Sequence, residues 1–121
     1  MSNTEIIWTE KHYTSRKYKY GGTPDLLVKK NGKHILIDFK SSSNVYVDNL
    51  LQGSAYAQLV KENDKIEIDQ FLVARFPKDN SEYEIKEFNK TDLKEAFKQF
   101  KIYLSAFEKD KELKKRMRKK K

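Results

Sequence analysis

Residues 25–40, DLLVKKNGKHILIDFK, decide the fold of this chain. Asn31-Gly32 between two apolar runs is the strongest short signal for a β-hairpin. A two-residue turn there pairs Lys30 with Lys33, and the same register places Asp25 directly opposite Asp38. The Cβ atoms of such a pair are about 4.5–5.5 Å apart on one face of the sheet. The sequence therefore predicts two carboxylates side by side.

Two like charges so placed are destabilising unless a cation lies between them, and Mg²⁺ or Mn²⁺ prefers carboxylate and carbonyl oxygens. Lys40 shares a strand face with Asp38, whereas Phe39 is expected to point into the core and to leave its backbone carbonyl as a further metal ligand. Such a site can lower the pKa of a water and neutralise charge that develops on a phosphate. Ser41 and Ser42 can donate hydrogen bonds to a phosphate.

The residues outward from the hairpin predict further strands and a helix. Residues 4–20 favour strand and are interrupted by Gly21-Gly-Thr-Pro24, and a polar loop follows at 41–44. Residues 47–62 predict a helix that has Leu51, Ala55 and Leu59 at helical spacing.

The second half of the chain predicts two more strands, 66–76 and 82–88, and a C-terminal helix capped by Asn89 or Thr91. The helix carries an apolar stripe that we expect in the core: Leu93, Ala96, Phe97, Phe100, Leu104 and Phe107. The order of elements predicts an α/β fold, a small mixed sheet flanked by helices.

Gln52 and Tyr56 lie four residues apart in the predicted helix, so one helical face presents both toward the polar end of the sheet. Neither this pair nor the acid-x-Lys pattern is selective alone. Gln99 and Tyr103 repeat the first spacing, and Glu84-Ile-Lys86 repeats the second on a strand. Only the order of the motifs along the chain is selective.

In that order, Gly21-Gly-Thr-Pro-Asp25, Asp38-Phe-Lys-Ser41 and Gln52-Gly-Ser-Ala-Tyr56 resemble the motifs of RecB-like nucleases in the PD-(D/E)XK superfamily. Free-standing viral and mitochondrial exonucleases belong to the same branch. The resemblance implies Mg²⁺- or Mn²⁺-dependent hydrolysis of DNA by a metal-activated water. It assigns Asp25 and Asp38 as metal ligands, Lys40 to the water or the transition state, and Gln52 and Tyr56 to positioning the lysine and the DNA backbone.

The chain departs from that family at its start. The family has a helix before the first strand, with a Glu or His that completes the metal site, whereas here a strand is predicted from residue 4. We therefore expect a restriction-endonuclease-like core lacking the usual N-terminal helix. Glu10 is the better replacement ligand, ahead of Glu5, and His12 is an alternative. A minimal site, a site completed by a partner subunit or a second copy of the chain, and a site that does not cut all remain open.

Charge divides the chain into a nuclease-like domain, residues 1–108, and a basic tail, residues 109–121. The tail has nine Lys and Arg residues against Asp110 and Glu112, so it carries +7 of the net +8. We expect it to fray or to extend the last helix. It suits a polyanion such as DNA, which Lys114, Lys115, Arg116 and Arg118 would contact, or it is a solvated end.

The sequence has no cysteine, which excludes disulfides and Cys-ligated metal centres. It contains no long apolar run and no secretory signal, so we expect no membrane contact and a cytoplasmic location, including that of a viral protein in its host. Two alternatives to a DNA nuclease remain: a nuclease-fold DNA-binding or accessory protein without turnover, and a junction-resolving endonuclease.

Overall fold

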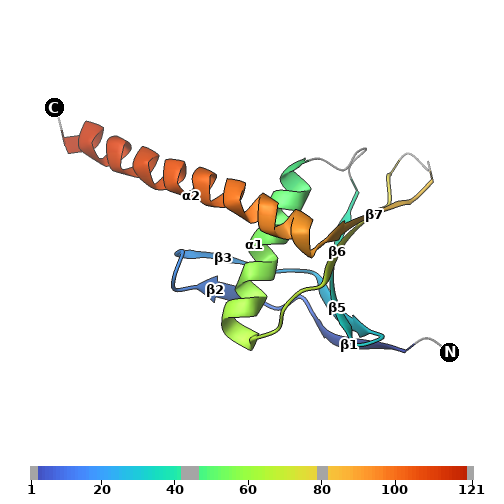
Figure 1. Ribbon diagram of the computed structural model, residues 1–121. Helices are drawn as coiled ribbons and strands as arrows, with labels where there is room; N and C mark the ends of the chain where they lie inside the picture. The colour runs from blue at the N-terminus through green and yellow to red at the C-terminus, as the bar shows by residue number, and fades with distance from the viewer. Residues whose placement is uncertain (1–2, 42–46, 79–81, 120–121) are drawn as a thin grey trace.

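A five-stranded mixed sheet with two helices on one side forms the protein, in a computed structural model that describes residues 3–41, 47–78 and 82–119 (Figure 1). The strands are adjacent in the order β1-β4-β5-β6-β7. Their bounds are β1 Thr4–Thr9, β4 Leu26–Lys30, β5 Lys33–Lys40, β6 Gln70–Arg75 and β7 Glu84–Asn89. The predicted α/β class with a small mixed sheet is confirmed.

Strands β5 and β6 are parallel and every other pair in the sheet is antiparallel. A parallel pair needs a long crossover connection, which here contains helix α1, Val47–Asp64. Leu51, Ala55 and Leu59 of α1 are buried, as their spacing predicted. A separate two-stranded sheet of β2 (Tyr13–Ser15) and β3 (Tyr20–Gly22) packs beside α1.

Helix α2, Lys90–Lys119, begins with a capping box. The backbone N–H of Asp92 donates to Asn89 Oδ1 at 2.9 Å, and the backbone N–H of Asn89 donates to Asp92 Oδ2 at 3.0 Å. Asn89 is therefore the cap, and Thr91 is not. Residues 109–119 continue the helix, with an ion pair of 3.2 Å between Lys114 and Asp110. Of the two expected forms of the tail, the structure has the helical one.

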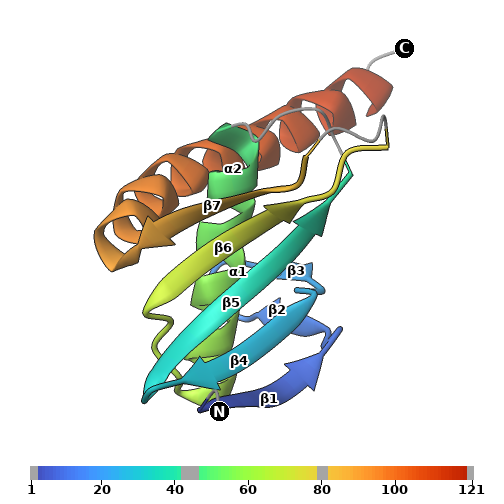
Figure 2. The same ribbon diagram turned by 90° about the vertical axis from the view of Figure 1, so that its right-hand side faces the viewer.

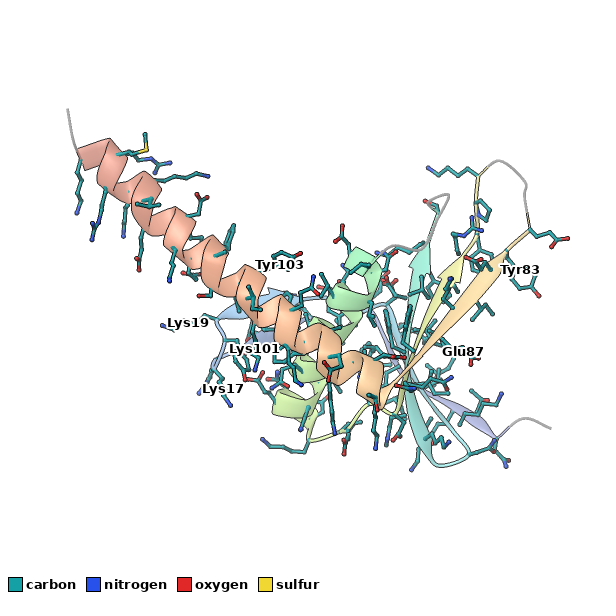
Figure 3. All side chains as sticks on the ribbon, turned by 45° about the horizontal axis from the view of Figure 1, so that its top comes forward. Lys17, Lys19, Tyr83, Glu87, Lys101 and Tyr103 are labelled. Atoms are coloured by element: carbon teal, nitrogen blue, oxygen red, sulfur yellow. The ribbon has the colours of Figure 1, made fainter. Side chains whose placement is uncertain are left out.

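The two faces of the sheet differ, because both helices cover the same face (Figures 1 and 2). Leu36, Phe71 and Val73 are completely buried against the helices. On the other face Phe39 is 48% exposed, and Figure 3 shows Tyr83 and Glu87 on that side of β7. The expectation that Phe39 points into the core is wrong: alternation places it opposite Asp38 and Lys40, on the face that the helices leave uncovered.

The apolar stripe of α2 is buried only near the start of the helix. Leu93 and Ala96 are buried in the core, whereas Phe107 is 56% exposed. The helix runs past the end of the sheet, so its later turns have no neighbour to cover them (Figure 1). The expectation that the whole stripe is core is therefore wrong at Phe107. Across the part of the chain that the structure describes, neither helix is long and apolar enough to cross a membrane.

Candidate active site

The β4–β5 hairpin brings Asp25 and Asp38 together. Asn31 and Gly32 both have positive φ, 52° and 80°, as a tight hairpin turn of this kind requires. Lys30 pairs with Lys33, so the predicted register is confirmed. Asp25 immediately precedes β4, and its Oδ2 accepts a hydrogen bond of 2.9 Å from the backbone N–H of Phe39. The first carboxylate is thereby fixed beside the second.

Asp38 is only 4% exposed, on the face that the helices cover. Lys40 Nζ lies 3.0 Å from Asp38 Oδ2, but the contact does not have hydrogen-bond geometry, and this buried oxygen accepts no hydrogen bond from the described residues. Burial, aided by a hydrogen bond with Asp25, raises the pKa of the Asp38 carboxyl to about 6, although the Lys40 ammonium acts in the opposite direction. An ionised Asp38 is thus costly without a further cation.

Two side chains of helix α1, Gln52 and Tyr56, extend the polar network that begins with the two aspartates and Lys40. Lys40 Nζ donates to Gln52 Oε1 at 2.9 Å, and Gln52 Nε2 donates to the Tyr56 hydroxyl oxygen at 3.0 Å. Burial, followed by the negative charges of Asp38 and Asp25, raises the pKa of Tyr56. The five side chains expected at one site therefore form one connected group at the boundary of sheet and helix.

Gly22 has a role that the sequence analysis missed. The Gly21-Gly22 pair does not interrupt the strands as expected but belongs to β3, paired with Tyr13 and Thr14. A Cβ added at Gly22 would lie 2.6 Å from Cε1 of Tyr56, so the absence of a side chain allows the Tyr56 ring to approach the strand. A glycine in a strand can mark such a close approach, and this was the available signal.

Glu10, the expected third acid, does not lie on a strand as predicted. It follows the end of β1, is exposed and has a φ of 43°. Its backbone N–H donates to the backbone oxygen of Asp25 at 2.7 Å. His12, the alternative, lies with Nδ1 2.9 Å from Thr23 Oγ1. No cluster of three or more His, Cys, Asp or Glu side chains suited to a metal occurs among the described residues.

The residues expected to contact DNA lie in separate places. Ser41 is exposed just after β5, and Ser42 lies outside the described residues. The four tail residues are exposed on the projecting end of α2 (Figure 1): Lys114, Lys115, Arg116 and Arg118. The tail and the acidic pair are thus well separated, and any common ligand must be an extended one.

The site fits a hard divalent cation by the chemistry of its donors. Asp38 presents a buried carboxylate oxygen without a hydrogen bond, and the Asp25 carboxylate lies beside it. Mg²⁺ is commonly held by one or two carboxylates together with waters and substrate phosphates. These two side chains are therefore of the kind that could hold such an ion.

Comparisons with known proteins bear on the fold. No protein-family model and no curated protein matches the chain. A protein of Eubacterium rectale described as a "putative exonuclease" is similar, with a TM-score of 0.60 and 14% identity over 82% of this chain and 43% of that one. SSO0001 has a TM-score of 0.49 and 20% identity over 84% and 51%. The chain spans about half the length of these proteins, and the first likeness shows a shared fold.

Proposed function

We propose that this chain is a metal-dependent DNA nuclease that hydrolyses phosphodiester bonds, and that it acts as an exonuclease. The observation that carries the proposal is the connected group formed by the acidic pair, Lys40, Gln52 and Tyr56, in which Asp38 is buried with a raised pKa. A carboxyl with a perturbed pKa beside an ammonium is typical of catalytic sites. The fold shared with the protein described as a "putative exonuclease" supports the same class.

Asp25 and Asp38, with the backbone carbonyl of Phe39, would hold Mg²⁺ or Mn²⁺. When bound, such an ion supplies a lowered pKa for water and charge neutralisation at phosphate. The raised pKa of Asp38 means that its carboxylate becomes available as a ligand at a pH above about 6. We therefore expect metal binding and cleavage to increase together through that pH.

Lys40 has the position of a group that orients the attacking water or stabilises the transition state. An ammonium has three N–H donors, of which one bonds to Gln52 Oε1, while Nζ forms an ion pair with Asp38. A further N–H can donate to a water or a phosphate oxygen. Gln52 holds the lysine, and Tyr56 holds Gln52, so both act as positioning residues unless the DNA backbone reaches the phenol.

DNA is the proposed partner, through contacts beside the acidic pair and along the tail. Ser41 and Ser42 follow the strand that carries Asp38 and Lys40, so they are close in sequence to the site of a bound phosphate. The tail of α2 adds exposed cations, which suit the backbone of an extended polyanion. A second copy or a partner subunit would supply any further acid that the metal needs.

A single gel assay tests the proposal. End-labelled linear DNA and circular DNA are incubated with the protein in Mg²⁺, in Mn²⁺ and in chelator. We expect shortening of linear strands in either metal, no reaction in chelator and little reaction on circles. Asp38→Asn should be inactive, whereas Glu84→Gln, the acid of the repeated acid-x-Lys pattern on β7, should behave as wild type.

Two results would contradict the proposal in different ways. Equal cleavage by wild type and Asp38→Asn would show that the activity does not come from this site. Binding of DNA without cleavage in any metal would make the chain a nuclease-fold DNA-binding protein instead. Cleavage of circles would retain the nuclease assignment but replace exonuclease by endonuclease action.

A further inference from the structure

A hollow lies between helices α1 and α2, on the side of α1 away from the candidate active site. It has a volume of about 300 Å³. Ser54, Gln58 and Lys61 line it and share one face of α1, because residues four and seven apart lie above one another on a helix. Gln52 is two residues from Ser54, a rotation of about 200° around the helix axis. A group bound in the hollow would therefore leave the candidate active site open.

The floor of the hollow is apolar and belongs to the fold. It is formed by Ala57, Ile68, Leu93 and Phe97. Ile68 and Leu93 are buried. The Phe97 ring meets Tyr18 edge to face with centroids 5.3 Å apart and stacks on Phe100 at 5.8 Å. The floor is thus fixed before anything binds, and it suits an apolar side chain.

The rim of the hollow is basic. Its charged residues are five lysines and one acid: Lys61, Lys90, Lys94, Lys98, Lys101 and Glu67. Lys90 and Lys98 each lie 3.1 Å from a carboxylate, that of Asp69 and that of Glu95. Within the part of the chain that the structure describes, the other three lysines form no ion pair. Positive charge without a counter-charge thus surrounds an apolar floor.

The lysines that α2 contributes to the rim form a row that does not stabilise the helix. Lys90, Lys94 and Lys98 follow one another at four-residue spacing, and like charges at this spacing are destabilising. Lys90 also lies in the first turn, where the helix dipole disfavours a cation. The row becomes favourable when an anionic group lies beside it. The stability of the fold therefore does not account for it.

We propose that the hollow binds an acidic segment of a partner protein, with one bulky apolar side chain of the segment on the floor and its carboxylates at the lysines. An acidic peptide supplies both groups that the hollow suits. The backbone of DNA supplies only the charge, and bases stack on exposed aromatic faces, whereas the Phe97 ring is already packed on Tyr18 and Phe100. The inference goes beyond the proposed nuclease function and does not depend on it.

The test is an NMR titration of the full chain with three blocked hexapeptides. The first has one phenylalanine among five acidic residues, the second has serine in place of the phenylalanine, and the third has the acids replaced by their amides. We expect the first to bind at least about tenfold more tightly than the second, as burial of an apolar side chain implies, and the third to bind more weakly than the first. The amide signals of Leu93 and Phe97 should shift, whereas that of Gly32 should not. Equal affinity for the first two peptides, or no shift at Leu93 and Phe97, would overturn the proposal.

The rim is tested by replacing Lys94, Lys98 and Lys101 together by Gln. The affinity for the first peptide should fall by about three- to 150-fold, the range expected for three exposed charge pairs. The matched control replaces three exposed lysines further along the same helix by Gln: Lys109, Lys111 and Lys115. It should stay within about twofold of wild type. Equal losses in the two variants would show that general charge, and not the hollow, binds the peptide.

The floor is tested by Ala57→Leu, which fills the hollow and keeps every charge of its rim. We expect this variant to fold, as checked by circular dichroism, and to lose most of the preference for phenylalanine over serine. Ala106→Leu, the same change at an exposed position of α2 outside the hollow, should keep the full preference. An unchanged preference in folded Ala57→Leu would contradict the assignment, and the lysine variants remain decisive if this variant is unfolded.

A titration with oligodeoxythymidine separates this proposal from DNA binding and from the nuclease proposal. An oligonucleotide that shifts the signals of Leu93 and Phe97, where the acidic peptide does not, would assign the hollow to DNA and overturn the proposal. A chain that binds the peptide there but cuts no DNA retains the docking site and loses the nuclease function. A chain that cuts DNA but does not distinguish the peptides retains the nuclease function and loses the docking site.

Discussion

Helices α1 and α2 carry the same pair of side chains with the same local hydrogen bond. Gln52 Nε2 donates to Tyr56 at 3.0 Å in α1, and Gln99 Nε2 donates to Tyr103 at 3.1 Å in α2. Among the described residues the first pair has a partner on another element, because Gln52 Oε1 accepts from Lys40 Nζ. Gln99 is exposed, and Tyr103, labelled in Figure 3, is 55% exposed. The four-residue spacing in a helix is enough to bring a Gln and a Tyr together. The candidate site exists only in α1, because β5 packs there and brings Lys40 to Gln52.

The two strands with an acid-x-Lys pattern differ in the same way. In β5 the acid is buried beside a second carboxylate. In β7 Glu84 lies 3.3 Å from Arg75 in a partly exposed ion pair, and Lys86 is exposed. Four of the proposed site residues, Asp38, Lys40, Gln52 and Tyr56, therefore have a counterpart elsewhere in the chain that serves as a control.

After the inactive Asp38→Asn, the largest effect on cleavage is expected from Lys40→Ala. Removing the ammonium should lower the cleavage rate by about 10²–10³-fold, the usual loss of one electrostatic contact to the transition state. The equivalent change in β7, Lys86→Ala, should stay within about two-fold of wild type in the same gel assay. Equal losses in the two variants would show that general charge, not the site, is responsible.

The next effect concerns stability and pH. Because burial raises the pKa of Asp38 to about 6, the folded protein holds a proton that the unfolded chain releases near pH 4, so metal-free stability falls as the pH rises from 4 to above 6. Asp38→Asn has no such carboxyl and should not lose stability in this way. The melting temperature of the variant relative to wild type should therefore rise by roughly 5–10 °C between pH 4 and 8, which corresponds to a difference on the order of 2 kcal/mol in the free energy of unfolding.

Melting both proteins in chelator across this range measures the difference directly. The two proteins differ at this one side chain, so the contributions of all the groups that they share cancel in the comparison. A gap that is constant with pH would mean that Asp38 ionises in the folded protein as freely as in the unfolded chain.

A smaller effect is expected from Gln52→Ala. Loss of the oxygen that holds Lys40 should lower kcat by about tenfold and leave KM nearly unchanged, as for partners that orient a catalytic group. Gln52→Glu keeps an acceptor for Lys40 and should recover most of the rate. Gln99→Ala, which removes the equivalent hydrogen bond in α2, should have no effect. A matching loss in Gln99→Ala would indicate a defect in folding.

The smallest effect on cleavage is expected from the tail. Replacing Lys114, Lys115, Arg116 and Arg118 by Gln should leave the rate at saturating DNA unchanged, because the tail is remote from the acidic pair. The slope of log affinity against log salt should nevertheless fall by about 3–4 on duplex DNA if all four contact phosphates. A matched change of Lys29, Lys30 and Lys33 should leave the slope unaltered. An unchanged slope in the tail variant would make the tail a solvated end.

Local signals predicted the hairpin and the helices well. Asn31-Gly32 specifies its turn through two positive φ values, and Asn89 with Asp92 specifies the start of α2. The uncovered face of the sheet could not be predicted, because alternation shows which side chains share a face and not which face a helix will cover. Phe39 was misplaced for that reason.

Most of the polar network was predictable because it depends on two short-range rules, the pairing in a hairpin and the four-residue spacing in a helix. The distance between Lys40 and Gln52 was not predictable, since it depends on how α1 packs on β5. The contact between the Tyr20 and Phe100 rings was missed as well, because it joins a helix far along the chain to a small sheet whose pairing the sequence did not indicate.

The Asn31-Gly32 turn has a consequence for how this protein can change in length. Because neighbouring positions of a strand point to opposite sides, adding one residue to either arm alone would send one carboxylate to the uncovered side of the sheet. Adding the same number of residues to both arms would only move the turn further from the site. A single extra residue in one arm could be accommodated by a β-bulge, like the irregularity between Ile6 and Trp8 of β1. We therefore expect this hairpin to accept insertions in matched steps, which keep Asp25 and Asp38 opposed.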